Sequence, residues 1–392
     1  MFSALRHLTL RALLPLLSVS LLGATLAGAQ TFNCGSTGSD GALSFPASAT
    51  PVTHVFDPKT FNPPLDPDGD GVYHFTTVNI PANVTVKIRA PEVGWVPLHW
   101  LCTGNVTIAG KLDLDGEAGH PAGAPIQEHV PSIPGPGGFP GGWGCVKSSG
   151  LDGAHGFGSG SGNVFCQPLR GGNGNRGDGP INYGVTNDNG QGGGAGGGAL
   201  LLASNTAITV TGIVSARFGL GYQDGTSGAI RLLAPTIGGD GRLDCGRNKN
   251  GWYGYIRLEA TNDNFSGTID AGTNIRRVTL APTATTILPQ GGVAKARLVR
   301  INGVAVPGTP SGLFVMPPDV EINTDQTVTF EVEASGIPLG TKVTIFLWNE
   351  TEQVLTFDTA PLEGSVASSM ATGTRKVPNG WSRGFIYAQW TQ

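Results

Sequence analysis

The sequence is poor in charged residues and in long apolar runs. Only 13% of its 392 residues are charged, against about 25% in an ordinary soluble domain. The formal net charge of −4 comes with no basic stripe, so nucleic acid is not an expected partner. After the N-terminal segment no apolar run reaches the roughly 20 residues that span a bilayer, so we expect no membrane contact by the mature chain.

Several catalytic signatures are also missing. There is no Asp-Asp dipeptide, no HExxH motif, no zinc-type Cys–His spacing, and no Lys-Ser/Thr after the glycine run 192–198. These absences argue against nucleotide binding, against a zinc enzyme, and against the pectin hydrolases that carry paired aspartates. Whether the protein is an enzyme stays open, with a non-catalytic role favoured.

The chain is instead rich in glycine and proline, with 62 Gly and 28 Pro. Glycine costs roughly 1 kcal/mol at each helix-interior position relative to alanine, so a mainly helical protein is excluded. Collagen is excluded as well, because no strict Gly-X-Y period runs through the sequence. The composition favours an all-β chain.

The N-terminus has the pattern of an export signal. Arg6 and Arg11 precede a Leu-rich apolar run, and Ala27-Gly28-Ala29 fits the small-x-small pattern of a cleavage site. We therefore predict a signal peptide over 1–29 and a secreted mature chain, located outside the cell, on its surface or in the periplasm.

Export makes disulfides an expectation for the five cysteines. Cys145 and Cys166 bracket a glycine-rich stretch and are the preferred pair, with Cys34 and Cys102 as the second. Cys245 lies where neighbouring repeats have a small apolar residue, which predicts a buried free thiol.

An internal repeat occurs in the second half of the chain. Short segments starting at Gly212, Gly241 and Gly267 recur at spacings of 29 and 26 residues, and Gly110 starts an earlier copy. Periods of 20 to 50 residues are typical of solenoids. The predicted inward positions are Leu112, Val214, Leu243 and Ile269, followed two residues later by Leu114, Ala216, Cys245 and Ala271. The predicted outward positions between them are Asp113, Ser215, Asp244 and Asp270.

A second strand family aligns Ala199–Ala203 with Ile230–Ala234 and Ile256–Ala260. Strands this short without helix patterns between them predict an all-β fold: a right-handed parallel β-helix-like solenoid over 30–285. It contains a glycine-rich insertion at 116–198, with 28 Gly in 83 positions, for which we expect low order outside a Cys145–Cys166 bridge. Alternating strands over 290–392 predict an immunoglobulin-like β-sandwich domain.

The segments 104–116, 135–139, 192–199 and 228–232 resemble a broad group of secreted bacterial glycine-rich β-helix-like proteins. The resemblance covers roughly 70–280, and the C-terminal sandwich is similar to one that often follows. Because members of this group are mostly uncharacterised, the resemblance implies fold and compartment and assigns no catalytic residue.

A calcium loop is one interpretation of Asp66, Asp68 and Asp70, which alternate and are followed by Gly71. The twelfth position of an EF-hand loop would be Thr77 where Glu is needed, so a polar turn between strands is the other interpretation.

Two further surfaces could carry function. Exposed aromatic rings stack on sugars, and Trp252, Tyr253, Tyr255 and Trp143 are candidates for carbohydrate binding. The outward row Asp113, Asp244 and Asp270, with Arg217, Arg231, Arg242 and Arg257, could instead serve a calcium-dependent polysaccharide lyase. The favoured function is a non-catalytic structural or adhesive protein of the cell surface or extracellular matrix. Its partner would be another copy of itself, through open sheet edges that could build fibres, or an extracellular polysaccharide.

Overall fold

The computed structural model describes residues 32–67, 71–125, 130–145, 164, 166, 169–178, 190–280, 287–288, 293–308, 317–324, 327–349, 354–377, 380, 382–388 and 390. Within them the chain is all-β, and the single helix is the 3₁₀ turn η1 (Pro58–Thr60). No helix of this part of the chain is long and apolar enough to cross a membrane. The predicted signal peptide over 1–29 lies outside the described residues.

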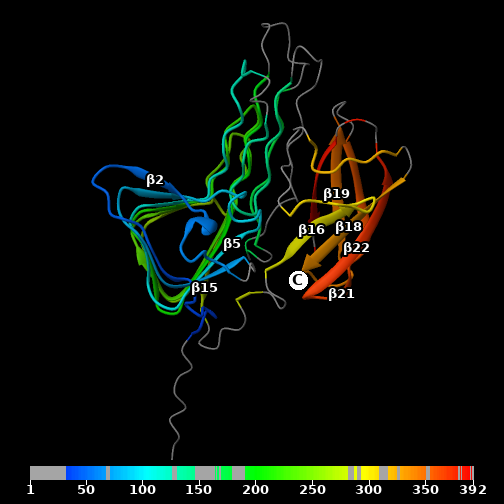
Figure 1. Ribbon diagram of the computed structural model, residues 1–392. Coiled ribbons are helices and arrows are strands. Elements are labelled where there is room, and N and C mark those ends of the chain that lie inside the picture. Colours follow the sequence, from blue (N-terminus) through cyan, green and yellow to red (C-terminus); the bar gives the residue numbers. More distant parts are fainter. Residues whose placement is uncertain are drawn as a thin grey trace, which may run out of the picture. The chain divides into compact units, whose positions relative to one another are not determined.

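Two parallel sheets form the first part of the structure (Figure 1). The nine-stranded sheet comprises β1 (Gly41–Ser44), β3 (Val72–Ile80), β5 (Leu98–Cys102), β6 (Val106–Ile108), β8 (Ala199–Ser204), β9 (Ala207–Val210), β11 (Ala229–Gly239), β13 (Tyr255–Phe265) and β15 (Ile275–Thr279). The six-stranded sheet comprises β2 (Val52–Val55), β4 (Val84–Lys87), β7 (Lys111–Asp113), β10 (Ile213–Ser215), β12 (Arg242–Asp244) and β14 (Thr268–Asp270).

From β10 onward, successive strands alternate between the two sheets. Each strand pairs in parallel with the equivalent strand of the previous repeat, and Val214 lies between Leu112 and Leu243 as the repeat predicted. Leu243 pairs in turn with Ile269. The predicted inward row is confirmed: Leu112, Val214 and Leu243 are fully buried, and Ile269 is half-buried against the same core.

The alignment of the other strand family was wrong by one residue for its first copy. Ile230 pairs with Leu200, not with Ala199, whereas its predicted pairing with Ile256 is confirmed. A shift of one residue exchanges the two faces of a strand. The run Ala199–Ala203 is apolar on both faces, so its sequence does not show which residues point inward.

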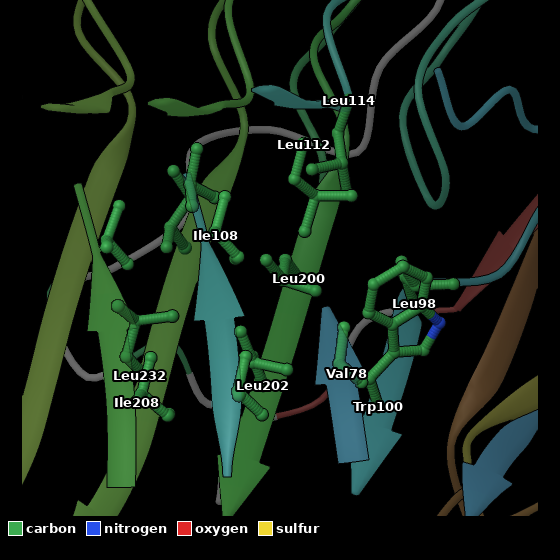
Figure 2. Packing of buried hydrophobic residues seen from close by; sticks show 14 of the residues in the cluster. Val78, Leu98, Trp100, Ile108, Leu112, Leu114, Leu200, Leu202, Ile208 and Leu232 are labelled. Atoms are coloured by element: carbon green, nitrogen blue, oxygen red, sulfur yellow. The ribbon is translucent and has the colours of Figure 1, made fainter. Parts of the chain in front are cut away.

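The interior between the two sheets is filled by aliphatic side chains. Leu200, Leu202 and Leu232 lie beside Ile108 and Ile208 (Figure 2). At the N-terminal end the core becomes aromatic: the ring of Trp100 lies 5.3 Å from Phe56 and 5.6 Å from Phe75, both edge-to-face. Burying the large aromatic and aliphatic side chains contributes roughly 1.5–3 kcal/mol each.

Five glycine-rich stretches run side by side without forming helix or strand. They are 114–120, 132–145, 169–178, 190–198 and 216–228. Backbone N–H groups of 190–198 change partner with a period of three. Gly192, Ala195 and Gly198 donate to 114–120, Gly193 and Gly196 donate to 132–145, and Gly194 and Gly197 donate to 216–228. A period of three residues, with hydrogen bonds only to neighbouring stretches and none within the stretch itself, is characteristic of a polyproline II helix.

The expectation of low order in this insertion is therefore wrong for its described stretches. A Cβ on Gly196 would lie 1.8 Å from the carbonyl oxygen of Gly172, and one on Gly194 would lie 1.9 Å from that of Gly219. Only glycine allows the backbones to approach this closely. The absence of side chains, which suggested a flexible linker, is what permits the hydrogen bonds. We call the five stretches the glycine bundle.

Two antiparallel sheets form the C-terminal part. The five-stranded sheet contains β16 (Lys295–Ile301), β17 (Val304–Ala305), β18 (Thr327–Ser335), β21 (Glu363–Ser365) and β22 (Ser368–Lys376). The three-stranded sheet contains β19 (Lys342–Asn349), β20 (Val354–Pro361) and β23 (Ser382–Ala388). The two sheets share one core, in which Phe330 and Phe357 pack edge-to-face at 5.2 Å.

The sequence did not reveal β22. Its inward positions are Ser369, Ala371 and Gly373, so the alternation of apolar and polar residues that marks a half-buried strand is absent. Small residues there make room for the large rings of the neighbouring strands.

Candidate functional site

The loop between β12 and β13 presents an aromatic side chain to solvent. Trp252 is 64% exposed, although its backbone is held in place. Solvent-exposed indoles are uncommon because each leaves a large apolar face in water. We call residues 246–253 the aromatic loop.

Asn248 is the residue that fixes this loop. Its side chain is buried, and its Oδ1 accepts the N–H groups of Asn250 at 3.1 Å and of Trp252 at 2.9 Å. The backbone N–H of Asn248 donates to the Trp252 carbonyl at 3.0 Å. Gly251 turns the chain with φ of +89°, a conformation that favours glycine.

The loop is also tied to the glycine bundle. Nδ2 of Asn248 donates to the Gly225 carbonyl at 2.7 Å, and the Ser227 hydroxyl donates to the Gly246 carbonyl at 2.7 Å. The backbone N–H of Lys249 donates to the buried carboxylate of Asp224 at 3.2 Å. Both sides of the loop are thus anchored to stretch 216–228, which keeps the entropy cost of holding Trp252 in one position low.

The neighbouring surface includes apolar side chains of the same stretch. Nζ of Lys249 donates to the carbonyls of Gly221 and Tyr222, which places the aromatic loop beside Tyr222. Leu220, the residue before Gly221, is 63% exposed. A flat apolar surface next to polar groups is what a sugar ring requires, since its C–H face stacks on an aromatic ring and its hydroxyls bond polar groups.

The four aromatic residues predicted to bind carbohydrate differ in their exposure to solvent. Trp252 is exposed, and Tyr253 and Tyr255 are half-buried. Burial also raises the pKa of Tyr255, so it remains a neutral phenol at pH 7. Trp143 is only 7% exposed, so its predicted contribution to a sugar-binding surface is wrong.

Comparisons with family models, with curated proteins and with solved structures find no match to this chain. What the site can bind follows from its own geometry.

The acidic row of the six-stranded sheet is present as the repeat predicted. Asp113, Ser215, Asp244 and Asp270 pair along one line. Every carboxylate in this row faces a cation. The ion pairs are Lys87–Asp113 at 3.4 Å, Lys111–Asp113 at 3.2 Å, Arg217–Asp244 at 3.8 Å, Arg242–Asp244 at 2.9 Å and Arg242–Asp270 at 2.8 Å.

Asp115 is a half-buried carboxylate beside this row. Burial alone would raise its pKa, but Lys111, the hydroxyl of Ser215 and the backbone N–H of Arg217 together lower it. Oδ1 accepts from the Arg217 N–H at 2.6 Å, and Lys111 Nζ lies 3.0 Å from Oδ2. A carboxylate held this way stays ionised, so Asp115 has a structural role in joining two successive repeats.

Only two of the four arginines expected beside the acidic row, Arg217 and Arg242, lie there. Arg231 and Arg257 lie on β11 and β13, in the other sheet, where both bind Glu259. The distances are 2.6 Å from Arg231 Nε and 2.8 Å from Arg257 Nε to Glu259 Oε1. The predicted grouping of Asp113, Asp244 and Asp270 with these two arginines is therefore wrong, because stacked repeats place the two rows on separate sheets.

The calcium interpretation of the 66–70 segment gains no support. Asp66 accepts the backbone N–H of Gly71 at 3.0 Å, as a turn residue does, and Asp68 and Asp70 lie outside the described residues. No group of three or more His, Cys, Asp or Glu side chains in the described part of the chain could hold a metal ion.

No disulfide forms among the described residues, which include all five cysteines. The predicted pairs Cys145–Cys166 and Cys34–Cys102 are not joined. The Cys145 backbone bonds Asp178 and Gly190 within the glycine bundle, whereas the Cys166 thiol lies close enough to Cys245 to act on its pKa. Cys34 donates to the Cys102 carbonyl at 3.3 Å. Cys245 is a fully buried free thiol, as predicted.

Thiol reactivity provides a test of this arrangement. Burial raises the pKa of Cys166 to about 12 and that of Cys102 to about 11, and the thiolate is the reactive form. At pH 8 we expect iodoacetamide to label the half-exposed Cys145 first and to leave Cys102 and Cys166 unmodified in the native protein, as counted by mass spectrometry.

Unfolding in denaturant without reductant should then expose every thiol to labelling. Cysteines that stay unlabelled under those conditions would show that disulfides form after export and would contradict the thiol arrangement of this structure.

Sequence reasoning found the aromatic cluster but missed the residues that make it a site. Asn248 and Lys249 carried no motif, because their roles depend on carbonyls of a stretch more than 20 residues earlier. The one available signal was the turn residue Gly251 directly before Trp252.

Proposed function

We propose that this chain is an exported, non-catalytic adhesive protein that binds extracellular polysaccharide on the aromatic loop. The observation that carries the proposal is the combination at Trp252: an indole 64% exposed to solvent on a backbone clamped by Asn248. A binding surface gains affinity when its contact residue is held in place before the ligand arrives.

The fold supports a scaffold for such a surface. Two parallel sheets with alternating strands, paired repeat on repeat, are what a right-handed parallel β-helix would have, and two antiparallel sheets around one core fit an immunoglobulin-like sandwich. We propose these classes for the two parts. Together with the predicted signal over 1–29, they agree with the resemblance to secreted glycine-rich β-helix-like proteins.

A lyase is the weaker alternative. Proton abstraction from a sugar needs a basic group and a metal or cation on the same face as the substrate. In the described structure the carboxylates of the acidic row form ion pairs with Lys87, Lys111 and Arg242, which disfavours their binding a bridging cation.

Fibre formation is also weaker than binding. The last strand of the nine-stranded sheet, β15, contains Arg276 and Arg277, and charged residues on an edge strand oppose pairing with another chain. We therefore favour a glycan over a second copy of the chain as the partner.

Replacing Trp252 should remove binding without unfolding the protein. We expect Trp252→Ala to weaken retention in native gels cast with polysaccharide by at least tenfold, because a buried aromatic contact in an interface is worth about 2 kcal/mol or more. Thermal unfolding should be unchanged, since the indole makes little contact with the core.

Trp95→Ala is the matched control. Trp95 is 48% exposed on another turn, so this variant also loses one exposed indole. Equal retention of Trp252→Ala and the unchanged protein on every polysaccharide would remove the basis of the proposal.

A further inference from the structure

The charged groups in and around the aromatic loop include one more cation than anions. The described charged groups around it are Arg217, Arg242, Arg247 and Lys249, with Asp224, Asp244 and Asp270. The three carboxylates are bound by Arg217, Arg242 and Lys249. Arg247 is exposed and forms no ion pair with any described residue. This local excess is notable in a chain with a formal net charge of −4.

The guanidinium of Arg247 lies against the turn that presents Trp252. A Cβ built on Gly251 would lie 3.3 Å from Nη2 of Arg247 and 3.6 Å from its Nε. Gly251 directly precedes Trp252 in the chain, so the guanidinium lies beside the backbone that carries the exposed indole. The missing side chain at Gly251 is what allows the guanidinium to rest there.

Lys249 is less available than Arg247 to bind an anionic ligand. Its ammonium group has three donors, and it already lies within bonding distance of the Gly221 and Tyr222 carbonyls and 3.4 Å from Asp224. Arg247 keeps its donors for a ligand, and a guanidinium fork matches the two oxygens of a carboxylate or of a sulfate.

We propose that the ligand of the aromatic loop is an anionic polysaccharide, with a sugar ring stacked on Trp252 and its carboxylate or sulfate group bound by Arg247. This inference rests on the proposed glycan binding and specifies the class of glycan. It makes Arg247 the residue that sets specificity, whereas Trp252 supplies contact with any sugar ring.

The test compares ligands that share a sugar backbone and differ in charge. The probes are polygalacturonate against its fully methyl-esterified form, and dextran sulfate against dextran. Dissociation constants of the full chain are measured for each pair at low and physiological salt. We expect the acidic member of at least one pair to bind about tenfold more tightly, since a hydrogen bond to a charged group is worth about 1.5 kcal/mol or more. Salt should reduce the preference for the acidic polymer. A preference within the polygalacturonate pair would identify a carboxylate as the bound group, and one within the dextran pair would identify a sulfate.

Three variants separate the residue roles. Arg247→Gln should remove the preference for the acidic polymer and leave binding of the neutral one, and Arg247→Lys should restore part of it. Arg375→Gln on β22 changes the net charge equally at an exposed position outside the aromatic loop and should keep the full preference. Trp252→Ala should lose both polymers.

The outcomes distinguish the two proposals. Equal binding of acidic and neutral polymers, or an unchanged preference in Arg247→Gln, overturns the anionic specificity and leaves glycan binding standing if Trp252→Ala still loses it. Absence of binding to all four polymers, or full binding by Trp252→Ala, overturns the glycan function and the specificity with it.

Discussion

Gly196→Ala should destabilise the glycine bundle by at least about 3 kcal/mol. The added methyl carbon would lie 1.8 Å from the Gly172 carbonyl oxygen and 2.3 Å from its carbonyl carbon. Both are backbone atoms, so no side-chain rotation can relieve the overlap, and overpacking with backbone shifts costs about 1–3 kcal/mol or more. The N–H of Gly196 would also lose its 2.9 Å bond to the Phe139 carbonyl.

The measurement is urea unfolding, with hydrogen exchange of the 190–198 amides as a local readout. Gly238→Ala on β11 is the matched control, because the nearest atom to its added carbon would be 4.0 Å away. That variant should change the free energy of unfolding by less than about 1 kcal/mol. Similar stability and exchange for both variants would mean that the stretches do not pack as a bundle.

The consequence reaches the aromatic loop. Asn248 and Lys249 are held by carbonyls of stretch 216–228, which itself bonds stretch 190–198. Loosening the bundle should therefore also weaken glycan binding, although Gly196 is not part of the loop. In the proposed function the glycine insertion serves to position a binding surface.

His99 should make the protein sensitive to acid. It lies on β5 and is 5% exposed, and burial, with a further contribution from Arg231, lowers its pKa from 6.5 to about 4. Its Nδ1 donates to the Pro97 carbonyl at 2.9 Å if the ring is the neutral Nδ1–H tautomer. Between pH 6.5 and 4, His99 is therefore neutral in the folded state and protonated in the unfolded state.

The sign of the pH effect follows from this difference. Above pH 6.5 both states are neutral at His99, and between pH 6.5 and 4 only the unfolded state is protonated, so the free energy of unfolding falls as the pH falls. Each unit of pKa difference is worth about 1.4 kcal/mol, which predicts a loss on the order of 3 kcal/mol at pH 4.

His99→Gln keeps a hydrogen-bond donor and cannot be protonated. Its stability at pH 7 should fall only by the cost of repacking, and its acid sensitivity should decrease. Urea unfolding at pH 7, 5.5 and 4.5 measures the difference, with His54→Gln as the control for loss of a histidine as such. An equally steep pH dependence in His99→Gln and the unchanged protein would assign the acid effect to other groups.

Local sequence patterns were sufficient where one face of a strand is apolar and the other polar. Val52–Val55, Val84–Lys87 and the strands that start at Ile213, Arg242 and Thr268 follow from alternation and from the repeat. Even the pairing of Val214 with Leu112 and Leu243 could be predicted, because parallel stacking places equivalent residues of successive repeats side by side.

Patterns failed where both faces of a segment have the same character. Ala199–Ala203 is apolar on both sides, so its register was shifted by one residue, and β22 has only small residues on its inward face, so it was missed. The glycine bundle is the extreme case, because a segment without side chains has no pattern from which its partners can be predicted.

The candidate site shows the same division. Composition and periodicity alone determined an all-β chain with a stacked repeat, an acidic row on its outer face and an aromatic segment at 252–255. Only the tertiary structure decided that Trp252 is exposed while Trp143 is buried, that the acidic row is neutralised, and that Arg247 remains available. The physical reason is that exposure and ion pairing depend on backbone segments brought together across the fold, and in this protein those segments are mostly glycine.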